Sequence, residues 1–340
     1  MKFVIHIGPH KTGTTYLQLG FRALRADLAA HGTIFPEFWE LAPGNPSQLH
    51  LTQQLRDGDT AKLAPRFAEL LGSGAERILL SSEDLSNLDA PALERLRALI
   101  GGNAVEFVFY IRRWSELIPS SWQESLKQGQ SHTFPEFVLV HLQRAEMSRL
   151  LNFDMKLGKF AEIFGAESLR IVGFCEVRER RMDLIQHFAS HFLEWADAPI
   201  PKLPPRANAS RDPREAELLR ALNAIARAHG GTPADALRKA FDRARENIDT
   251  TLLYAAMDRH TATLRLNESL PALVRLHETL AEKYLPRMVP PRLPNKLFRP
   301  RNPEVSYIAP DYLAEPGAAT ALRTAFAQLG MPAEVRAEVG

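Results

Sequence analysis

The chain has 340 residues, of which 45% are hydrophobic and 24% charged, and its formal net charge is +2. This composition is typical of a soluble globular protein, and it excludes a disordered chain, a collagen-like repeat and a nucleic-acid binder that acts through bulk positive charge. The single cysteine, Cys175, excludes an intrachain disulfide and a cysteine-rich zinc site. We therefore expect no nucleic-acid partner.

The sequence also argues against a membrane-spanning or secreted chain. No stretch reaches the roughly 18 apolar residues of a membrane helix. Residues 1–7 run directly into a glycine-containing turn, without the apolar segment and cleavage site of a signal peptide. We expect a cytoplasmic protein.

The first half of the chain alternates short apolar runs with helical patterns, which predicts an α/β protein with a parallel sheet covered by helices on both faces. A helix is predicted over residues 14–30, where apolar side chains recur at helical spacing before Gly32. Residues 36–60 are polar and contain three prolines, which predicts a long loop of the kind that is often functional. Strands are predicted over residues 2–7, 77–81, 105–111 and 169–174.

The second half is mostly helical in its patterns, and two proline-rich stretches interrupt it. Residues 198–213 contain five prolines, and residues 285–303 contain six prolines and five basic residues without an acid. We interpret the basic stretch as a solvated linker, with a contact to an anionic acceptor or to lipid head groups at a membrane surface as the alternative. The predicted organisation is an α/β domain over residues 1–230 and a helical extension over residues 231–340. Helices are predicted over residues 214–228, 237–247 and 252–285.

A turn with the sequence GPHKTGTT, residues 8–15, joins the first predicted strand to the first predicted helix. In this context, the backbone N–H groups of the turn and of the helix start form an anion site. Gly8 and Gly13 match the glycines of the nucleotide-hydrolase pattern GxxxxGK[ST], but Thr14 stands where that pattern has lysine. The lysine of this loop is Lys11, which lies inside the turn and not at the start of the helix. This position places its charge beside an anion shorter than a triphosphate, near the leaving group of that anion.

A second polar pair follows the third predicted strand. Arg112 stands at the carboxyl end of that strand, where open α/β sheets bind ligands. Ser120 comes about two helical turns later, so the two side chains are suited to hold one phosphate from two sides. Arg113 and Ser121 have the same spacing, and we favour Arg112 and Ser120 because of the position of Arg112 at the strand end.

Together, these motifs resemble the sulfotransferases that use 3′-phosphoadenosine 5′-phosphosulfate (PAPS), and in particular their bacterial branch. Members of that branch carry HIGxHKTGTTxLQ near the amino terminus, SSE after a middle strand and YxRR before a helix that bears a serine. This chain has HIGPHKTGTTYLQ from residue 6, SSE from residue 81 and YIRR from residue 110. The resemblance implies a P-loop-like α/β fold over roughly residues 2–225. It also implies transfer of a sulfuryl group from PAPS to a hydroxyl or amine.

The resemblance further implies the ligands and the residues that hold them. The product would be adenosine 3′,5′-bisphosphate, no metal would be required, and the acceptor would be a carbohydrate, a glycolipid or a small molecule. Lys11 would stabilise charge on the leaving group, while Arg112 and Ser120 would bind the 3′-phosphate. The 5′-phosphosulfate would be bound by His10, Lys11, Thr12, Gly13, Thr14 and Thr15.

An acceptor hydroxyl must lose its proton to a base in the cleft. Glu83 is our first choice because it occupies the SSE position of the resembling family. Glu37, in the predicted loop after the first helix, and His50 are the alternatives. A helix start capped by Ser82 or Asp84, with Glu83 merely solvated, is the non-catalytic interpretation.

Other residues are assigned more than one role. Arg206 or Arg211 would close on the 3′-phosphate, and a helix cap by Asn208 or Ser210 is the alternative. Phe38 and Trp39 are interpreted as core residues, with a platform for a sugar ring as the alternative.

Two rival functions remain. A P-loop kinase of a small molecule would use Asp84 for magnesium, but it does not fit Thr14 and leaves Arg112 unexplained. A nucleotide-binding protein of the same fold without catalysis is the second rival.

Overall fold

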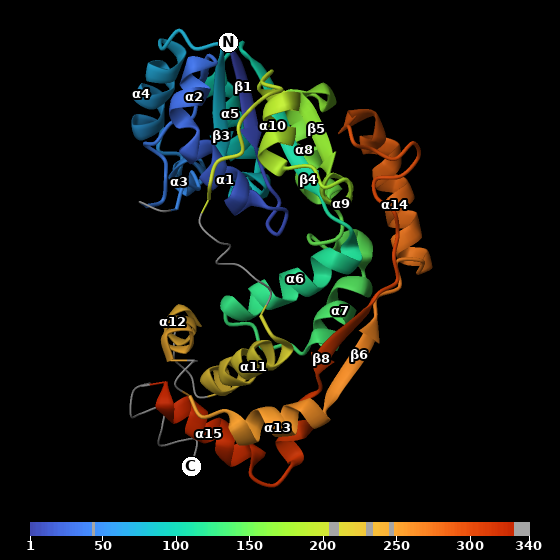
Figure 1. Cartoon of the computed structure of the whole chain (residues 1–340). Helices are drawn as coiled ribbons and strands as arrows, with labels where there is room; N and C mark the ends of the chain where they lie inside the picture. Colours follow the sequence, from blue (N-terminus) through green and yellow to red (C-terminus); the bar gives the residue numbers. More distant parts are fainter. Residues whose placement is uncertain (43–44, 204–210, 229–233, 245–247, 330–340) are drawn as a thin grey trace. The chain divides into compact units, whose positions relative to one another are not determined.

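The structure is a computed structural model that describes residues 1–42, 45–203, 211–228, 234–244 and 248–329 (Figure 1). The chain divides into two compact units, each made of several segments. Both units combine residues from either side of position 230, the domain boundary that the sequence suggested. The sheet unit comprises Met1–Arg113, Ala145–Pro205 and Pro271–Pro300, and the helical unit comprises Trp114–Arg144, Arg206–Leu270 and Arg301–Gly340.

A six-stranded sheet in the order β2-β3-β1-β4-β5-β7 forms the centre of the sheet unit, and all its strand pairs are parallel. The predicted α/β class is therefore confirmed. In the register, Lys2 lies opposite both Arg77 and Ala104, so the carboxyl ends of β1, β3 and β4 share one edge. The strands are β1 (Lys2–His6), β2 (Thr33–Ile34), β3 (Arg77–Ser81), β4 (Ala104–Ile111), β5 (Leu169–Gly173) and β7 (Met288–Val289).

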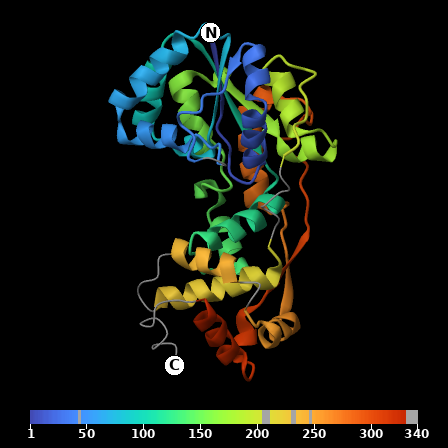
Figure 2. The ribbon, with the colours of Figure 1, turned by 60° about the vertical axis from the view of Figure 1, so that its left-hand side comes forward.

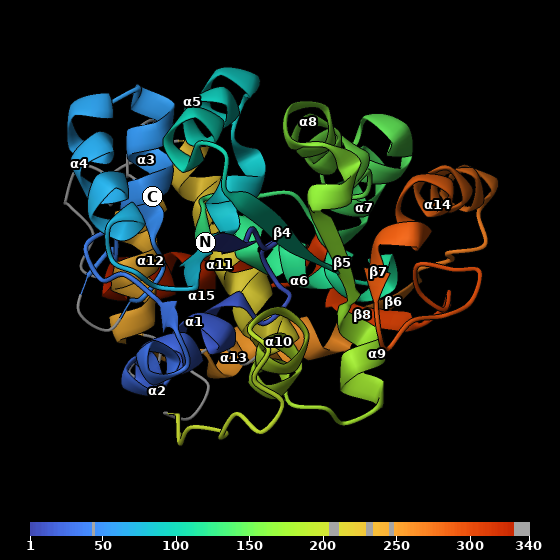
Figure 3. The ribbon, with the colours of Figure 1, turned by 90° about the horizontal axis from the view of Figure 1, so that it is seen from above.

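Helices cover both faces of this sheet (Figure 3). Helices α1, α2 and α10 lie on one face, and α4, α5 and α8 lie on the other. The α-helices of the unit are α1 (Thr14–Ala23), α2 (Arg25–Ala30), α3 (Leu49–Asp57), α4 (Thr60–Leu71), α5 (Ala90–Ile100), α8 (Asp154–Phe164), α9 (Phe174–Glu179), α10 (Leu184–Phe192) and α14 (Pro271–Tyr284). Short 3-10 helices are η1 (Glu83–Asn87), η2 (Ala145–Met147), η3 (Ala166–Ser168) and η4 (Leu285–Arg287).

The core on the α1 face is made by alternate residues of the central strands and one stripe of each helix. Leu17 and Phe21 of α1 pack with Ile185 and Phe188 of α10. Gly20 lets the two helices approach closely, since a Cβ there would lie 2.2 Å from Ile185 Cδ1 and would force that side chain to move. Because burying each large apolar side chain contributes about 1.5–3 kcal/mol, this seam fixes α1, and the turn before it, against the sheet.

Three local predictions are corrected. The predicted helix over residues 14–30 breaks at Leu24, which separates α1 from α2. The predicted loop over residues 36–60 contains α3, whose buried face is Leu51, Thr52 and Leu55. Part of the basic proline-rich stretch is not a solvated linker, because its residues 288–289 form β7 and pair with β5.

Buried histidines make the sheet unit sensitive to acid. His6 is fully buried with its Nδ1 2.8 Å from Ser81 Oγ, and burial lowers its pKa to about 3. Burial likewise lowers the pKa of His187 and of His277 to about 4. Since these pKa values lie below those of the unfolded chain, the stabilisation is complete above pH 6.5. It is lost as the pH falls toward 4.

We expect the free energy of unfolding to fall between pH 7 and pH 5, with about 2 kcal/mol of the loss due to His6 alone. Urea unfolding at the two pH values measures the loss. His6→Gln keeps a hydrogen-bonding side chain that does not titrate. Its free energy of unfolding is therefore expected to fall by about 2 kcal/mol less than that of the native chain over the same pH range. An equal loss in the variant and the native chain would contradict the role of His6.

The helical unit is held by packed helices and a two-stranded ribbon. Helix α6 (Trp114–Lys127) packs against α11 (Pro213–Ala228), as Figure 2 shows in green and yellow. Glu268 accepts hydrogen bonds from the backbone N–H of Ser115 (2.6 Å) and of Arg301 (2.7 Å), and so ties α6 to the segment before the ribbon's second strand. The other elements are α7 (Phe134–Leu142), α12 (Ala234–Ala244), α13 (Thr251–Arg259), η5 (Pro310–Ala314), α15 (Ala318–Gln328) and the antiparallel strands β6 (Thr261–Arg265) and β8 (Glu304–Ile308).

The long helix predicted over residues 252–285 is wrong. That stretch contains α13, β6 and α14, and α14 belongs to the sheet unit. Thr261 and Thr263 interrupt the helical pattern in favour of a strand, as β-branched residues do. In the part of the chain that the structure describes, no helix is long and apolar enough to cross a membrane.

Candidate functional site

The turn between β1 and α1 is held at the carboxyl edge of the sheet by its neighbours. Gly8 has φ +87°, and a Cβ there would lie 2.9 Å from Cα of Glu83. Gly13 has φ +80°, and a Cβ there would lie 2.6 Å from Leu184 Cδ1. Both glycines are therefore required by backbone conformation and by close packing, so their presence alone is no proof of a bound phosphate.

The helix start after this turn is suited to an anion. Gly13 precedes α1 without a side-chain cap, so the first N–H groups of the helix keep their positive partial charge unshared by a capping side chain. Thr14 is buried and Thr15 is exposed at this end. The Thr12 side chain has another role, since its Oγ1 donates to Pro9 O (2.6 Å) and closes the turn. Of the predicted loop ligands, Thr12 thus offers its backbone rather than its hydroxyl.

Two arginines lie beside this turn. Arg112, directly after β4, donates from Nη1 to Lys11 O (2.7 Å), which joins it to the loop. Its guanidinium lies 5.5 Å from the ring centre of Phe174, and that of Arg178 on α9 lies 5.4 Å from the same ring. Phe174 also borders Gly13. The ring therefore gathers two cations near the start of α1.

Arg178 is a residue that the sequence reasoning missed. It stands shortly after the strand predicted over residues 169–174, at the same edge of the sheet as Arg112. A cationic residue shortly after a strand of a parallel sheet is a candidate ligand for an anion, and this position could have pointed to Arg178 from the sequence.

The structure separates the two alternative arginine–serine pairs. Arg113 is fully buried, and its guanidinium donates to Arg299 O (2.7 Å) and to Glu179 Oε1 (2.8 Å). This structural role favours Arg112 as the ligand. Ser120 and Ser121 lie on α6 in the helical unit, so their pairing with a residue of the sheet unit stays a prediction. Arg206, with Asn208 and Ser210, lies outside the described residues. Arg211 pairs with Asp242 at 2.6 Å.

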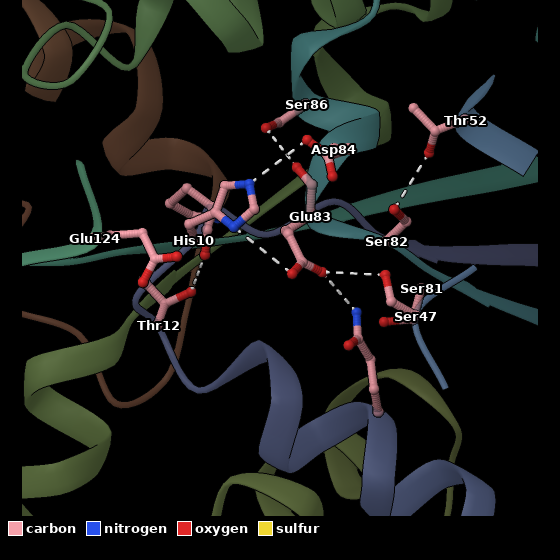
Figure 4. Close-up of polar contacts among 12 residues, drawn as sticks. His10, Thr12, Ser47, Thr52, Ser81, Ser82, Glu83, Asp84, Ser86 and Glu124 are labelled. Atoms are coloured by element: carbon pink, nitrogen blue, oxygen red, sulfur yellow. Dashed lines mark hydrogen bonds and ion pairs between the residues drawn. The ribbon is translucent and has the colours of Figure 1, made fainter. Parts of the chain in front are cut away.

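Glu83 lies next to the turn, directly after β3, and it is held by several contacts (Figure 4). Its Oε2 accepts from Gln18 Nε2 (2.8 Å) and lies 3.5 Å from Ser47 Oγ. Its Oε1 lies 3.6 Å from His10 Nδ1. The side chain is 16% exposed, so this carboxylate is fixed in place and still reachable. The interpretation of Glu83 as merely solvated is wrong.

His10 connects Glu83 with Asp84, since its Nε2 lies 3.5 Å from Asp84 Oδ1 (Figure 4). Burial lowers the pKa of His10, but the hydrogen bond to Asp84 and the charges of both carboxylates outweigh it and raise the pKa. The hydrogen bond to His10 in turn lowers the pKa of Asp84. Both residues are therefore favoured in their charged forms.

The competing bases lie in other contacts. Glu37 pairs with Arg25 and its side chain is 69% exposed. His50 Nδ1 lies 3.2 Å from Gln53 Oε1. Among the described residues, neither Glu37 nor His50 forms a hydrogen bond or an ion pair with Glu83. Trp39 is buried against Phe67 with its Nε1 bonded to Gln54, so its interpretation as a core residue is confirmed.

Comparison of the chain with protein-family models, with curated proteins and with solved structures found no match. Within the described ranges, no group of three or more histidine, cysteine, aspartate or glutamate side chains is placed to hold a metal ion.

Proposed function

We propose that this protein is a sulfotransferase that moves a sulfuryl group from PAPS to a hydroxyl or amine of an acceptor. The observation that carries the proposal is the combination at one sheet edge of an uncapped helix start, a lysine inside the preceding turn and a hydrogen-bonded carboxylate. A P-loop kinase would need its lysine at position 14, where this chain has threonine.

The residues beside the turn fit the anionic part of such a donor. The start of α1 and Lys11 supply positive charge for the 5′-phosphosulfate, and Arg112 and Arg178 supply it for a second phosphate. PAPS would bring an activated sulfuryl group, whose transfer develops charge on the leaving oxygen. Lys11 would stabilise that charge electrostatically, as preorganised cations do in phosphoryl transfer.

The acceptor side would be organised by Glu83. Gln18 and Ser47 orient its carboxylate, which would take the proton of the acceptor hydroxyl. His10 and Asp84 border the same carboxylate and surround it with charged groups.

Two further parts of the proposal concern other features of the protein. We keep a cytoplasmic location, and we keep Ser120 as the partner of Arg112 at the 3′-phosphate.

Calorimetric titration with adenosine 3′,5′-bisphosphate, in parallel with AMP and ATP–Mg²⁺, tests the proposal. We expect micromolar binding that requires the 3′-phosphate and no metal. Arg112→Ala is expected to weaken this binding by about tenfold or more, because charge-assisted hydrogen bonds of 1.5–3 kcal/mol are lost. Arg66→Ala, which removes a half-exposed arginine stacked on Phe38, is the matched control and is expected to bind normally.

Three outcomes would contradict this assignment in whole or in part. Preference for ATP–Mg²⁺ would favour the kinase, and absence of any nucleotide binding would remove the donor site. Binding of the bisphosphate without turnover of PAPS against a broad panel of acceptors would favour the non-catalytic rival.

A further inference from the structure

A cluster of four cations surrounds η1, the 3-10 helix that begins with Glu83, and the proposed reaction uses none of them. Arg56 of α3 donates from Nη2 to Asp84 O (3.3 Å). Lys159 of α8 donates to Leu88 O, at the end of η1. Lys156 stands one turn earlier on the same face of α8, which packs against η1. Arg149, on the chain before α8, is counted with them because its charge acts on both lysines.

The charges of these residues act on one another. The positive charge of Arg149 disfavours the charged form of both Lys156 and Lys159, and that of Arg56 acts on Lys159 in the same direction. Two carboxylates oppose these cations: Asp84, which also pairs with His10, and Asp89, which caps α5 by accepting from Ala92 N (3.0 Å) and favours the charged form of Lys159. Four cations thus stand against these two carboxylates. The cluster therefore keeps an excess of positive charge.

Lys156 is the least compensated member. Its side chain is half-buried, and among the described residues its ammonium group makes no hydrogen bond or ion pair. Burial, and then the charge of Arg149, lower its pKa to about 8 although Asp84 opposes this. An ammonium group held partly out of water beside other cations is costly, and a bound anion would relieve that cost.

This site borders the proposed acceptor side. Helix α8, which carries Lys156, packs against η1, which begins with Glu83. The charge of Lys156 also acts on Asp84 and on His10, which lies 3.6 Å from Glu83 Oε1. We propose that Lys156, with Arg149 and Lys159, binds an anionic group of the acceptor. The acceptor would then carry a carboxylate, phosphate or sulfate close to the hydroxyl that reacts. The inference that the bound group belongs to an acceptor rests on the proposed function. The anion site itself does not depend on that function.

Protection of Lys156 from acylation by an amine-reactive reagent, measured by mass spectrometry of the full chain at pH 8, tests the inference without turnover. The probes are glucose 6-phosphate, glucuronate, neutral glucose and adenosine 3′,5′-bisphosphate, each alone. We expect protection by one or both anionic sugars and none by glucose. Exposed Lys202 is the internal control and is expected to react equally in all samples. The two anionic sugars distinguish a phosphate from a carboxylate ligand.

Calorimetry with variants supplies a second measurement. Lys156→Gln is expected to weaken binding of the protecting sugar about tenfold, as loss of one charge-assisted bond does. Lys156→Arg keeps the charge and is expected to retain binding, while Lys202→Gln is expected to change nothing. Affinity is also expected to fall above pH 8, where Lys156 loses its proton beside Asp84, His10, Arg149 and Lys159.

The outcomes separate this inference from the proposed function. Binding of the bisphosphate without protection by either anionic sugar would overturn the inference and leave the function intact. Protection by the bisphosphate alone would assign the cluster to the nucleotide and also overturn it. Protection by an anionic sugar without bisphosphate binding would support the anion site and overturn the sulfotransferase.

Discussion

Lys11→Ala is expected to lower kcat by about a hundred- to a thousandfold, and to weaken the affinity for adenosine 3′,5′-bisphosphate by a much smaller factor. Removing one preorganised group that stabilises transition-state charge has effects of about this size. Lys11 has φ +69°, and alanine meets the same backbone strain as lysine there, so the loop is expected to keep its conformation. Turnover of PAPS with an acceptor found by screening gives kcat, and calorimetry gives the affinity for the bisphosphate.

Lys202→Ala, in the same unit but exposed, is the control for the loss of one lysine charge. A near-native kcat in Lys11→Ala would refute the role of Lys11 at the leaving group. A large loss of bisphosphate affinity with unchanged kcat would make Lys11 a binding residue instead. An unchanged circular dichroism spectrum establishes that the loop variant is folded.

Much of the fold could be predicted because the central strands are short, apolar and buried on both faces. Arg77–Ser81 was predicted to its ends, and β4 and β5 to within one residue. Such apolar runs can be recognised as strands from the local sequence pattern alone. Of the strands that were missed, β6 and β8 have five residues each and pair only with one another. In the central sheet, the missed strands β2 and β7 have two residues each and form where neighbouring strands offer them hydrogen bonds. No local pattern in a proline-rich stretch could reveal β7.

The candidate site was predictable in part for a related reason. Residues just after parallel strands meet at one edge, so the spacing of Gly8, Glu83 and Arg112 along the chain was informative. The contacts of individual side chains were not accessible. The bond of Thr12 to Pro9 and the burial of Arg113 against Glu179 change the roles of both residues, and neither contact has a signal in the sequence. The same holds for the cations of α8 around η1.

Glu83→Gln is expected to lower kcat by about a hundred- to ten-thousandfold, the range for loss of a general base. Glutamine keeps the size of the side chain and can still bond Gln18 and Ser47, so the variant removes the proton acceptor rather than the local structure. The affinity for the bisphosphate is expected to stay within about twofold of native, because only the acceptor side is changed. The kcat and the bisphosphate affinity, measured on the same preparations, test both statements.

The variants Glu37→Gln and His50→Asn decide between the three candidate bases. Glu37 is bound to Arg25 and His50 lies against Gln53, whereas Glu83 adjoins the turn itself, with its Cα 2.9 Å from where a Cβ on Gly8 would lie. Because a base must reach the proton that it removes, we expect the large loss of kcat in Glu83→Gln alone. A comparable loss in Glu37→Gln or His50→Asn, with a small one in Glu83→Gln, would move the base to that residue. The carboxylate at position 83 would then serve to hold His10.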